Sequence, residues 1–181
     1  MTAPRFVRAA LRAGAALAAA LLVACGGAAK QEALVGVSAP DTNAPVSFAF
    51  DSLDARPVSS AAMQGKPAVL VFVTTWDTLS QAQVAYAVAV ASDEGPRAGF
   101  ALVALQDPSA RELVEIYRDT MKVTFPVALG DPATIAGGGS LGDVHEVPSI
   151  VMLDAAGRVA WRHAGLVKPD ELRARLKPLR R

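Results

Sequence analysis

The sequence predicts an α/β protein with a central mixed sheet flanked by helices and an N-terminal β-hairpin extension. Two runs, 68–76 and 100–106, are apolar almost without interruption, which is typical of strands buried on both faces. A segment of helical composition separates them, as in the units that build parallel sheets. Near the C-terminus, 149–154 and 158–163 are divided only by a turn and predict an antiparallel pair. The sheet is therefore expected to be mixed.

The elements up to the first helix follow from local signals. The segments 46–50 and 56–59 flank Asp51-Ser-Leu-Asp-Ala55, which predicts a short hairpin. Gly65-Lys66-Pro67 predicts a turn before the first buried strand. The segment 77–92 then has the length and composition of a helix.

The helix predicted over 77–92 carries no charge after Asp77 until its end, and its apolar residues lie on more than one face. A half-exposed helix normally shows a polar stripe. Either this helix is buried beneath neighbouring elements, or it presents an apolar patch to a partner. We favour burial.

The second half of the chain has equally local signals. Asp107 is an N-cap residue and Pro108 suits the first helical position, so a helix is expected up to Met121. The remaining segments are a short extended stretch at 125–129, a helical turn opened by Asp131-Pro132, a loose Gly137-Gly-Gly139, a hairpin turn at Ala155-Ala-Gly157, and a terminal amphipathic helix over 168–179.

The N-terminal residues are typical of a secretory signal. Arg5, Arg8 and Arg12 form a basic region without any acid, and an apolar run follows from Ala13 to Ala24. Leu22-Val-Ala-Cys25 resembles a bacterial lipobox, in which the cysteine sulfur receives a diacylglyceryl group. In the alternative interpretation, Cys25 is an incidental thiol in an ordinary signal peptide.

The lipobox interpretation predicts three parts: a lipoprotein signal peptide over 1–24, a lipidated Cys25 with a flexible tether over 25–45, and one globular domain over 46–181. The tether is small, polar and interrupted by prolines. Acyl chains on Cys25 would hold the domain at a membrane of the bacterial cell envelope. Gly26, rather than Asp, follows the cysteine and resembles the sorting default for the periplasmic face of the outer membrane.

Composition excludes several classes of function. The chain has 18 basic and 17 acidic residues, and from Cys25 onward the balance is 15 minus 17, or −2, so nothing indicates a nucleic-acid partner. One cysteine cannot form an intramolecular disulfide or a CxxC pair. His145 and His163 have no cysteine or second histidine at ligand spacing, so we expect no metal and no cofactor. A hydrolase built from Ser80, His145 and Asp77 lacks the usual Gly-x-Ser-x-Gly.

The chain resembles the TlpA-like/redoxin (AhpC/TSA-type) branch of the thioredoxin superfamily from about Ala39 to Leu179. The resemblance implies a thioredoxin-like fold. It rests on segments that fall in the family's order and spacing: Ala39-Pro40, the predicted hairpin, Gly65-Lys66-Pro67, Thr75-Trp76, Val147-Pro148-Ser149 and 152–158.

This chain lacks the cysteines of the family's active site. The family's strand ends in Trp-Cys-x-x-Cys, whereas here the matching residues are Trp76-Asp77-Thr78-Leu79-Ser80. Thiol-disulfide exchange needs a thiolate, which neither Asp77 nor Ser80 supplies. We therefore expect no catalytic residue and no dithiol activity. Asp77 is interpreted mainly as an N-cap, and Trp76 either closes the core or borders a functional surface.

The resemblance also implies a binding groove. Pro148 matches the family's cis-proline, and the backbone of Val147 can pair with an extended peptide. The predicted groove consists of Trp76, Asp77, Val147, Pro148 and Ser149, and its expected partner is a protein or peptide. Two alternatives remain: a thiol-disulfide oxidoreductase or antioxidant-type enzyme that uses partner thiols or a cofactor, and a purely structural envelope component.

Overall fold

The computed structural model describes residues 44–142 and 144–180. The predicted signal peptide over 1–24, Cys25 and nearly all of the predicted tether lie outside the described residues. The described elements are β1 (Ala49–Ser52), β2 (Val58–Ser59), α1 (Ser60–Met63), β3 (Ala68–Val73), α2 (Thr78–Glu94), η1 (Gly95–Arg97), β4 (Gly99–Ala104), η2 (Pro108–Ala110), α3 (Arg111–Thr120), β5 (Val127–Leu129), α4 (Pro132–Ile135), β6 (Ser149–Leu153), β7 (Val159–Ala164), α5 (Pro169–Leu176) and η3 (Lys177–Arg180).

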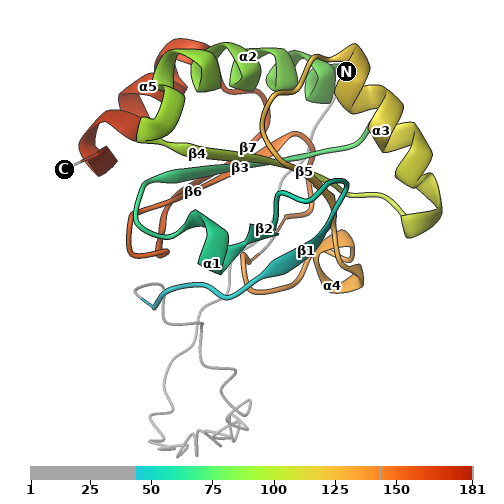
Figure 1. The fold of residues 1–181 in the computed structure, drawn as a ribbon, viewed down its shortest axis with the longest axis horizontal. Helices are drawn as coiled ribbons and strands as arrows, with labels where there is room; N and C mark the ends of the chain where they lie inside the picture. Colours follow the sequence, from blue (N-terminus) through green and yellow to red (C-terminus); the bar gives the residue numbers. More distant parts are fainter. Residues whose placement is uncertain (1–43, 143, 181) are drawn as a thin grey trace, which may run out of the picture. The chain divides into compact units, whose positions relative to one another are not determined.

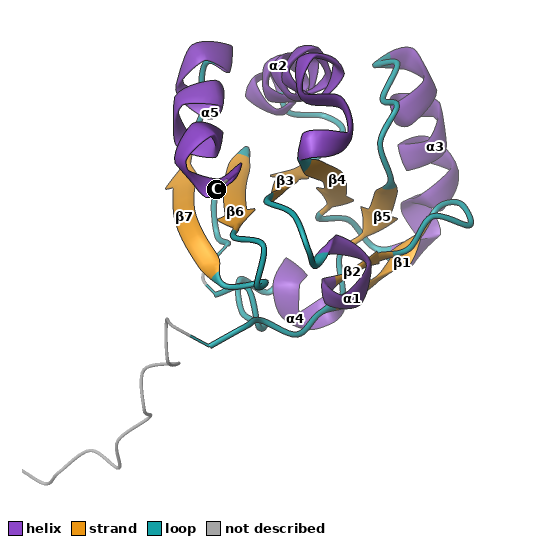
Figure 2. Cartoon of the chain, turned by 60° about the vertical axis from the view of Figure 1, so that its left-hand side comes forward, coloured by secondary structure: helices purple, strands orange, loops and turns teal. Residues whose placement is uncertain are grey.

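The strands form one mixed sheet in the order β2-β1-β5-β4-β3-β6-β7. β3, β4 and β5 run parallel, while β6 is antiparallel to β3 and β7 is antiparallel to β6. Helices α2, α3 and α5 cover one face, and the short helices α1 and α4 lie on the other (Figures 1 and 2). The predicted fold class, with its parallel centre, C-terminal hairpin and N-terminal hairpin, is confirmed.

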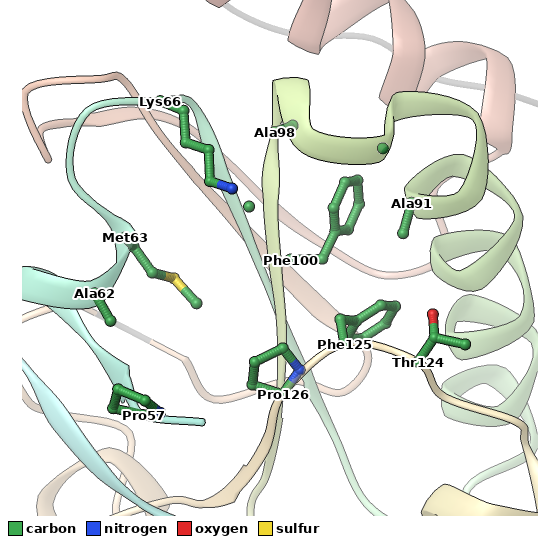
Figure 3. Close-up of a pocket in the computed structure, with 12 residues that line it drawn as sticks. Pro57, Ala62, Met63, Lys66, Ala91, Ala98, Phe100, Thr124, Phe125 and Pro126 are labelled. Atoms are coloured by element: carbon green, nitrogen blue, oxygen red, sulfur yellow. The ribbon is translucent and has the colours of Figure 1, made fainter. Parts of the chain in front are cut away.

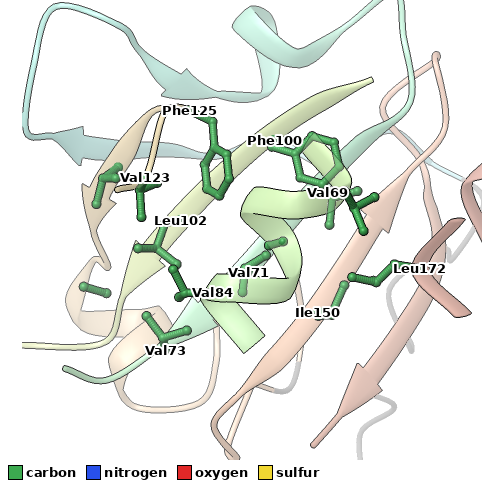
Figure 4. Packing of buried hydrophobic residues seen from close by; sticks show 14 of the residues in the cluster. Val69, Val71, Val73, Val84, Phe100, Leu102, Val123, Phe125, Ile150 and Leu172 are labelled. Carbon is green, nitrogen blue, oxygen red and sulfur yellow. The ribbon is translucent and has the colours of Figure 1, made fainter. Parts of the chain in front are cut away.

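The continuous apolar run of β3 follows from its position between two cores. Val69, Val71 and Val73 point into the cluster beneath α2 and α5, part of which Figure 4 shows. Leu70 and Phe72 point into a second cluster on the opposite face. Because both faces are covered, no position in this strand is available for a polar side chain.

Several boundaries differ from those predicted. β1 begins at Ala49 rather than Val46, where it pairs with β2 and then with β5. β3 ends at Val73, because Thr74, Thr75 and Trp76 form the connection to α2. The turn before β3 also contains the four-residue helix α1, which composition did not indicate.

Full burial of α2, the interpretation favoured from its composition, is wrong. Val84, Ala87 and Val90 are buried, but Ala85 and Ala89 on the outer face are exposed. Between Leu79 and Asp93, the exposed residues of α2 are alanines and uncharged polar residues in place of the usual charges. Among the described residues, no helix has both the length and the apolar character needed to cross a membrane.

Candidate functional site

The topology gathers the predicted site residues at one edge of the sheet. β3, β4 and β5 are parallel, so the segments that follow them leave at the same edge. Phe72 pairs with Ser149, so antiparallel β6 begins where β3 ends. We call this region the Trp76 edge: residues 74–80, 105–107, 130–131 and 146–149.

Trp76 lies on the surface of this edge. Its side chain is 70% exposed, and that of Leu79, in the first turn of α2, is 50% exposed. Exposed apolar side chains that lie close together can form a surface for a partner. Trp76 therefore does not close the core, and its place at a functional surface stays a prediction.

Asp77 is the N-cap of α2. Its Oδ2 accepts a hydrogen bond from the Ser80 N–H at 2.6 Å. Hydrogen bonds from the Ser80 hydroxyl and the Ser80 N–H, with a smaller one from the Leu79 N–H, lower the pKa of Asp77 from its ordinary 3.8. The edge thus carries a carboxylate that stays ionised at neutral pH.

Ser80 is fully buried under the first turn of α2. Its Oγ accepts a hydrogen bond from the Thr74 N–H at 3.4 Å, and this bond ties the helix to the end of β3. Asp77 and Ser80, the residues that the resemblance matches to the family's cysteines, are thus hydrogen-bonding groups in this structure. Neither a carboxylate nor a hydroxyl can form a mixed disulfide.

The loop before β6 completes the edge. The Val147–Pro148 peptide bond is cis, as the resemblance predicts. The Pro148 carbonyl accepts a hydrogen bond from the Gly165 N–H at 2.7 Å. Ser149 is only 5% exposed, and its Oγ donates to the Glu146 carbonyl at 2.5 Å, so its side chain positions the loop.

Sequence reasoning missed the buried polar groups behind this edge. The Gln106 Oε1 accepts a hydrogen bond from the Thr75 N–H at 3.0 Å and supports the connection that carries Trp76. Within the described residues, three side-chain atoms here have no hydrogen-bond partner: Thr74 Oγ1, Gln106 Nε2 and the Tyr117 hydroxyl. Burial, and then the charge of Asp77, raise the pKa of Tyr117 to about 12. A glutamine at the end of the otherwise apolar run 100–106 was the available signal.

The described residues do not form the alternative hydrolase or metal site. Ser80, the nucleophile of the conceivable hydrolase, is buried and already hydrogen-bonded. His145 lies on the surface against Gly137, while His163 stacks on Trp161 with ring centroids 5.4 Å apart. Over 44–142 and 144–180, no three His, Cys, Asp or Glu side chains are placed to hold a metal ion.

Cavities lie both near the predicted groove and far from it. One of about 200 Å³ is lined by Ser149, Val144 and residues of β6 and β7. Another of about 230 Å³ lies at the opposite edge of the sheet, between Met63, Phe100 and Pro126, with the Lys66 side chain reaching along it (Figure 3). Nothing in the sequence had indicated the second cavity.

No family model and no curated protein sequence matches the chain. Solved structures do match it. A thiol:disulfide interchange protein of the thioredoxin family from Chlorobium tepidum is 22% identical, with a TM-score of 0.65 over 76% of this chain and 95% of that one. A DsbF homologue from Corynebacterium diphtheriae is 22% identical, with a TM-score of 0.66 over 75% and 87%. A thio-disulfide isomerase from Thermus thermophilus is 26% identical, with a TM-score of 0.61 over 75% and 94%.

These likenesses establish the fold of the described domain. The chain has the thioredoxin-like fold, and the structures similar to it include thiol:disulfide interchange proteins.

Proposed function

We propose that this protein is a lipid-anchored, thioredoxin-like protein of the bacterial cell envelope that binds a protein or peptide at the Trp76 edge and carries out no disulfide exchange. The structure of the two positions that the resemblance matches to cysteines supports the proposal. Asp77 and Ser80 both serve as hydrogen-bonding groups at the start of α2, and the described residues contain no cysteine.

Exposure at the same edge supports binding. Trp76 and Leu79 offer apolar surface beside the ionised Asp77 carboxylate. Aromatic side chains are enriched at the centres of protein interfaces, where they contribute large contact areas. The partner surface that fits is apolar with a basic side chain opposite Asp77.

The lipid anchor rests on the leader sequence alone. The basic region, the apolar run and the Leu22-Val-Ala-Cys25 pattern together support cleavage before Cys25 and its acylation. Stable attachment to a bilayer requires more than one acyl chain, which a diacylglyceryl group supplies. The periplasmic face of the outer membrane is the proposed location.

A trapping experiment tests the binding function. Asp77→Cys, alkylated with a benzophenone maleimide, places a photo-crosslinker beside Trp76, so a bound partner should be held covalently on illumination whether or not it has a thiol. The matched control is Ala155→Cys, an exposed position at the other edge of the sheet. We expect discrete adducts only with Asp77→Cys, reduced severalfold when Trp76→Ala is added. Equal adducts from both cysteines, or none from Asp77→Cys, would refute binding at this edge.

The class of the similar structures favours one alternative. Because these proteins are thiol:disulfide interchange proteins, this chain could serve the same chemistry with thiols supplied by a partner. An insulin reduction assay distinguishes such an oxidoreductase from a binding protein. If the protein is a purely structural component of the envelope, the trapping experiment should give no adduct.

A further inference from the structure

The described chain begins at the edge of the sheet opposite Trp76. Pro45 forms an isolated antiparallel bridge with Arg158, and the Val46 N–H donates to the Gly157 carbonyl at 2.9 Å. Residues 155–157 form the turn between β6 and β7, which lies at the far end of β6 from Ser149. The predicted tether therefore joins the domain at this edge.

The same edge carries a basic cavity of about 290 Å³. Lys66, Arg97 and Arg180 line it, together with Ala155 of the β6–β7 turn. We call this region the Lys66 edge: Lys66, Arg97, Arg158, Lys177 and Arg180, at or next to the starts of β3 and β4 and in the β6–β7 turn and η3.

The carboxylates at the Lys66 edge do not cancel its charge. Glu94 pairs with Arg180 at 2.6 Å and with Arg97 at 3.8 Å, but it is only 4% exposed and lies beneath them. Asp154 lies 3.9 Å from Arg158. Asp93, whose carbonyl accepts a hydrogen bond from Arg97, pairs with Arg173 at 2.6 Å. Among the described residues, the five basic side chains of the Lys66 edge therefore outnumber the carboxylates Asp93, Glu94 and Asp154, and the Arg97 side chain is 60% exposed.

The Trp76 edge has the opposite charge. Asp77, Asp107 and Asp131 follow β3, β4 and β5, and Glu146 precedes β6. The parallel strands collect these acids at one edge, while the residues before β3, β4 and β7, together with η3 after α5, place the basic groups at the other. The charge of the domain is therefore polarised along its strands.

We propose that the Lys66 edge docks on anionic lipid head groups, so that the Trp76 edge faces away from the membrane. This proposal rests on the lipid anchor of the proposed function. Basic side chains within about 10 Å of an anionic bilayer are attracted to it, beyond which salt screens the attraction. The 19 residues between Cys25 and Pro45 span at most about 70 Å when extended, so the tether permits this contact without enforcing it. The acidic edge is repelled by the same surface, which fixes the orientation.

Fluorescence quenching of the lipidated full-length protein in vesicles tests the orientation. A bimane label is placed at Ala155→Cys on the Lys66 edge or at Ser109→Cys, which is exposed in η2 at the other edge. Vesicles contain head-group quencher in phosphatidylcholine, with or without one third phosphatidylglycerol. We expect severalfold stronger quenching at Ala155 than at Ser109, only in the anionic vesicles, and its loss in high salt. Equal quenching of the two labels would overturn the proposal.

Charge reversal supplies the matched control. Lys66→Glu combined with Lys177→Glu leaves Glu94 and its partners intact and should abolish the selective quenching. Lys168→Glu removes one exposed basic residue beyond the far end of β7 and should retain it. Retained selectivity in the Lys66→Glu/Lys177→Glu protein would refute docking.

Flotation separates this proposal from the anchor. If Cys25→Ser no longer floats on phosphatidylcholine vesicles, the anchor is supported, whatever the labels show. If the native chain itself fails to float there, the anchor is refuted. Docking is then decided by whether the native chain binds phosphatidylglycerol vesicles in a salt-sensitive way that Lys66→Glu/Lys177→Glu removes.

Discussion

Asp77 places a negative charge at the start of α2 without the reactivity of a thiolate. A carboxylate at a helix N-terminus satisfies an unpaired N–H and interacts favourably with the helix dipole. The 2.6 Å bond to the Ser80 N–H shows that this cap is formed. The side chain therefore has a structural role whether or not a partner also contacts it.

Removing the cap should destabilise the domain. We expect Asp77→Ala to lower the free energy of unfolding by about 0.5–2 kcal/mol, because a capping oxygen is lost. Asp77→Asn keeps an oxygen at the same position and should cost much less. Urea unfolding of both variants measures the difference, and an Ala variant as stable as the Asn variant would contradict the capping role.

Asp54 makes a pH-dependent contribution to the stability of the fold. Hydrogen bonds from the Arg56 side chain and backbone lower its pKa from 3.8 to about 2. A lowered carboxylate pKa stabilises the fold above the ordinary value, and this contribution is lost as the pH falls toward the folded-state value. The stability difference between the native protein and Asp54→Asn should therefore shrink between about pH 5 and about pH 2 in urea unfolding series. A constant difference would show that the pair does not stabilise the fold.

Residue roles were only partly predictable. Asp77 was predicted as an N-cap because its type and position before a helix suffice for that inference. The sequence could not assign Trp76 to core or surface, since that depends on where the connection after β3 turns. Thr74, Gln106 and Tyr117 went unnoticed because their burial comes from tertiary packing, which a local pattern does not record.

At the scale of elements, a single glutamine joins α2 to the chain before α5. Gln83 is fully buried, its Nε2 donates to the Val167 carbonyl at 3.2 Å, and its Oε1 accepts from the Val167 N–H at 2.6 Å. The two bonds satisfy both backbone groups of a buried residue. A glutamine in a helix is normally expected on the exposed face. The sequence pattern therefore does not predict that Gln83 is buried and hydrogen-bonded to Val167.

Breaking that link should be costly. Gln83→Ala leaves the Val167 N–H and carbonyl buried without partners, and we expect a loss of about 1–3 kcal/mol in unfolding free energy. Gln81→Ala, at an exposed position of the same helix, should change stability by no more than about 0.5 kcal/mol. Urea denaturation of the two variants tests this prediction. Equal losses of unfolding free energy would show that the Gln83–Val167 bonds do not stabilise the fold.

The fold of the whole molecule was predictable because its central strands are unambiguous. The runs that became β3 and β4 are apolar throughout, and the helix between them requires a parallel crossover. The polarity of charge between the two edges was not predicted, because residues before and after a strand are equivalent in a linear sequence until the topology separates them.

The two-sided core predicts where truncation matters. Leu102 is fully buried between β4 and the helices, so Leu102→Ala should cost about 2–5 kcal/mol. Leu113, 49% exposed on α3, should tolerate alanine with a change of about 0.5 kcal/mol or less. Thermal and urea unfolding measure both variants. An equal loss of unfolding free energy in Leu102→Ala and Leu113→Ala would contradict the packing described for Leu102.

The central claim is that a thioredoxin-like framework persists here without its chemistry. Insulin disulfide reduction with dithiothreitol, using Cys25→Ser protein that contains no thiol, tests it most directly. The account predicts no rate above dithiothreitol alone, and acceleration once Asp77→Cys and Ser80→Cys are added to the same protein. Acceleration by the thiol-free protein would contradict the account and favour an enzyme whose reactive centre lies elsewhere.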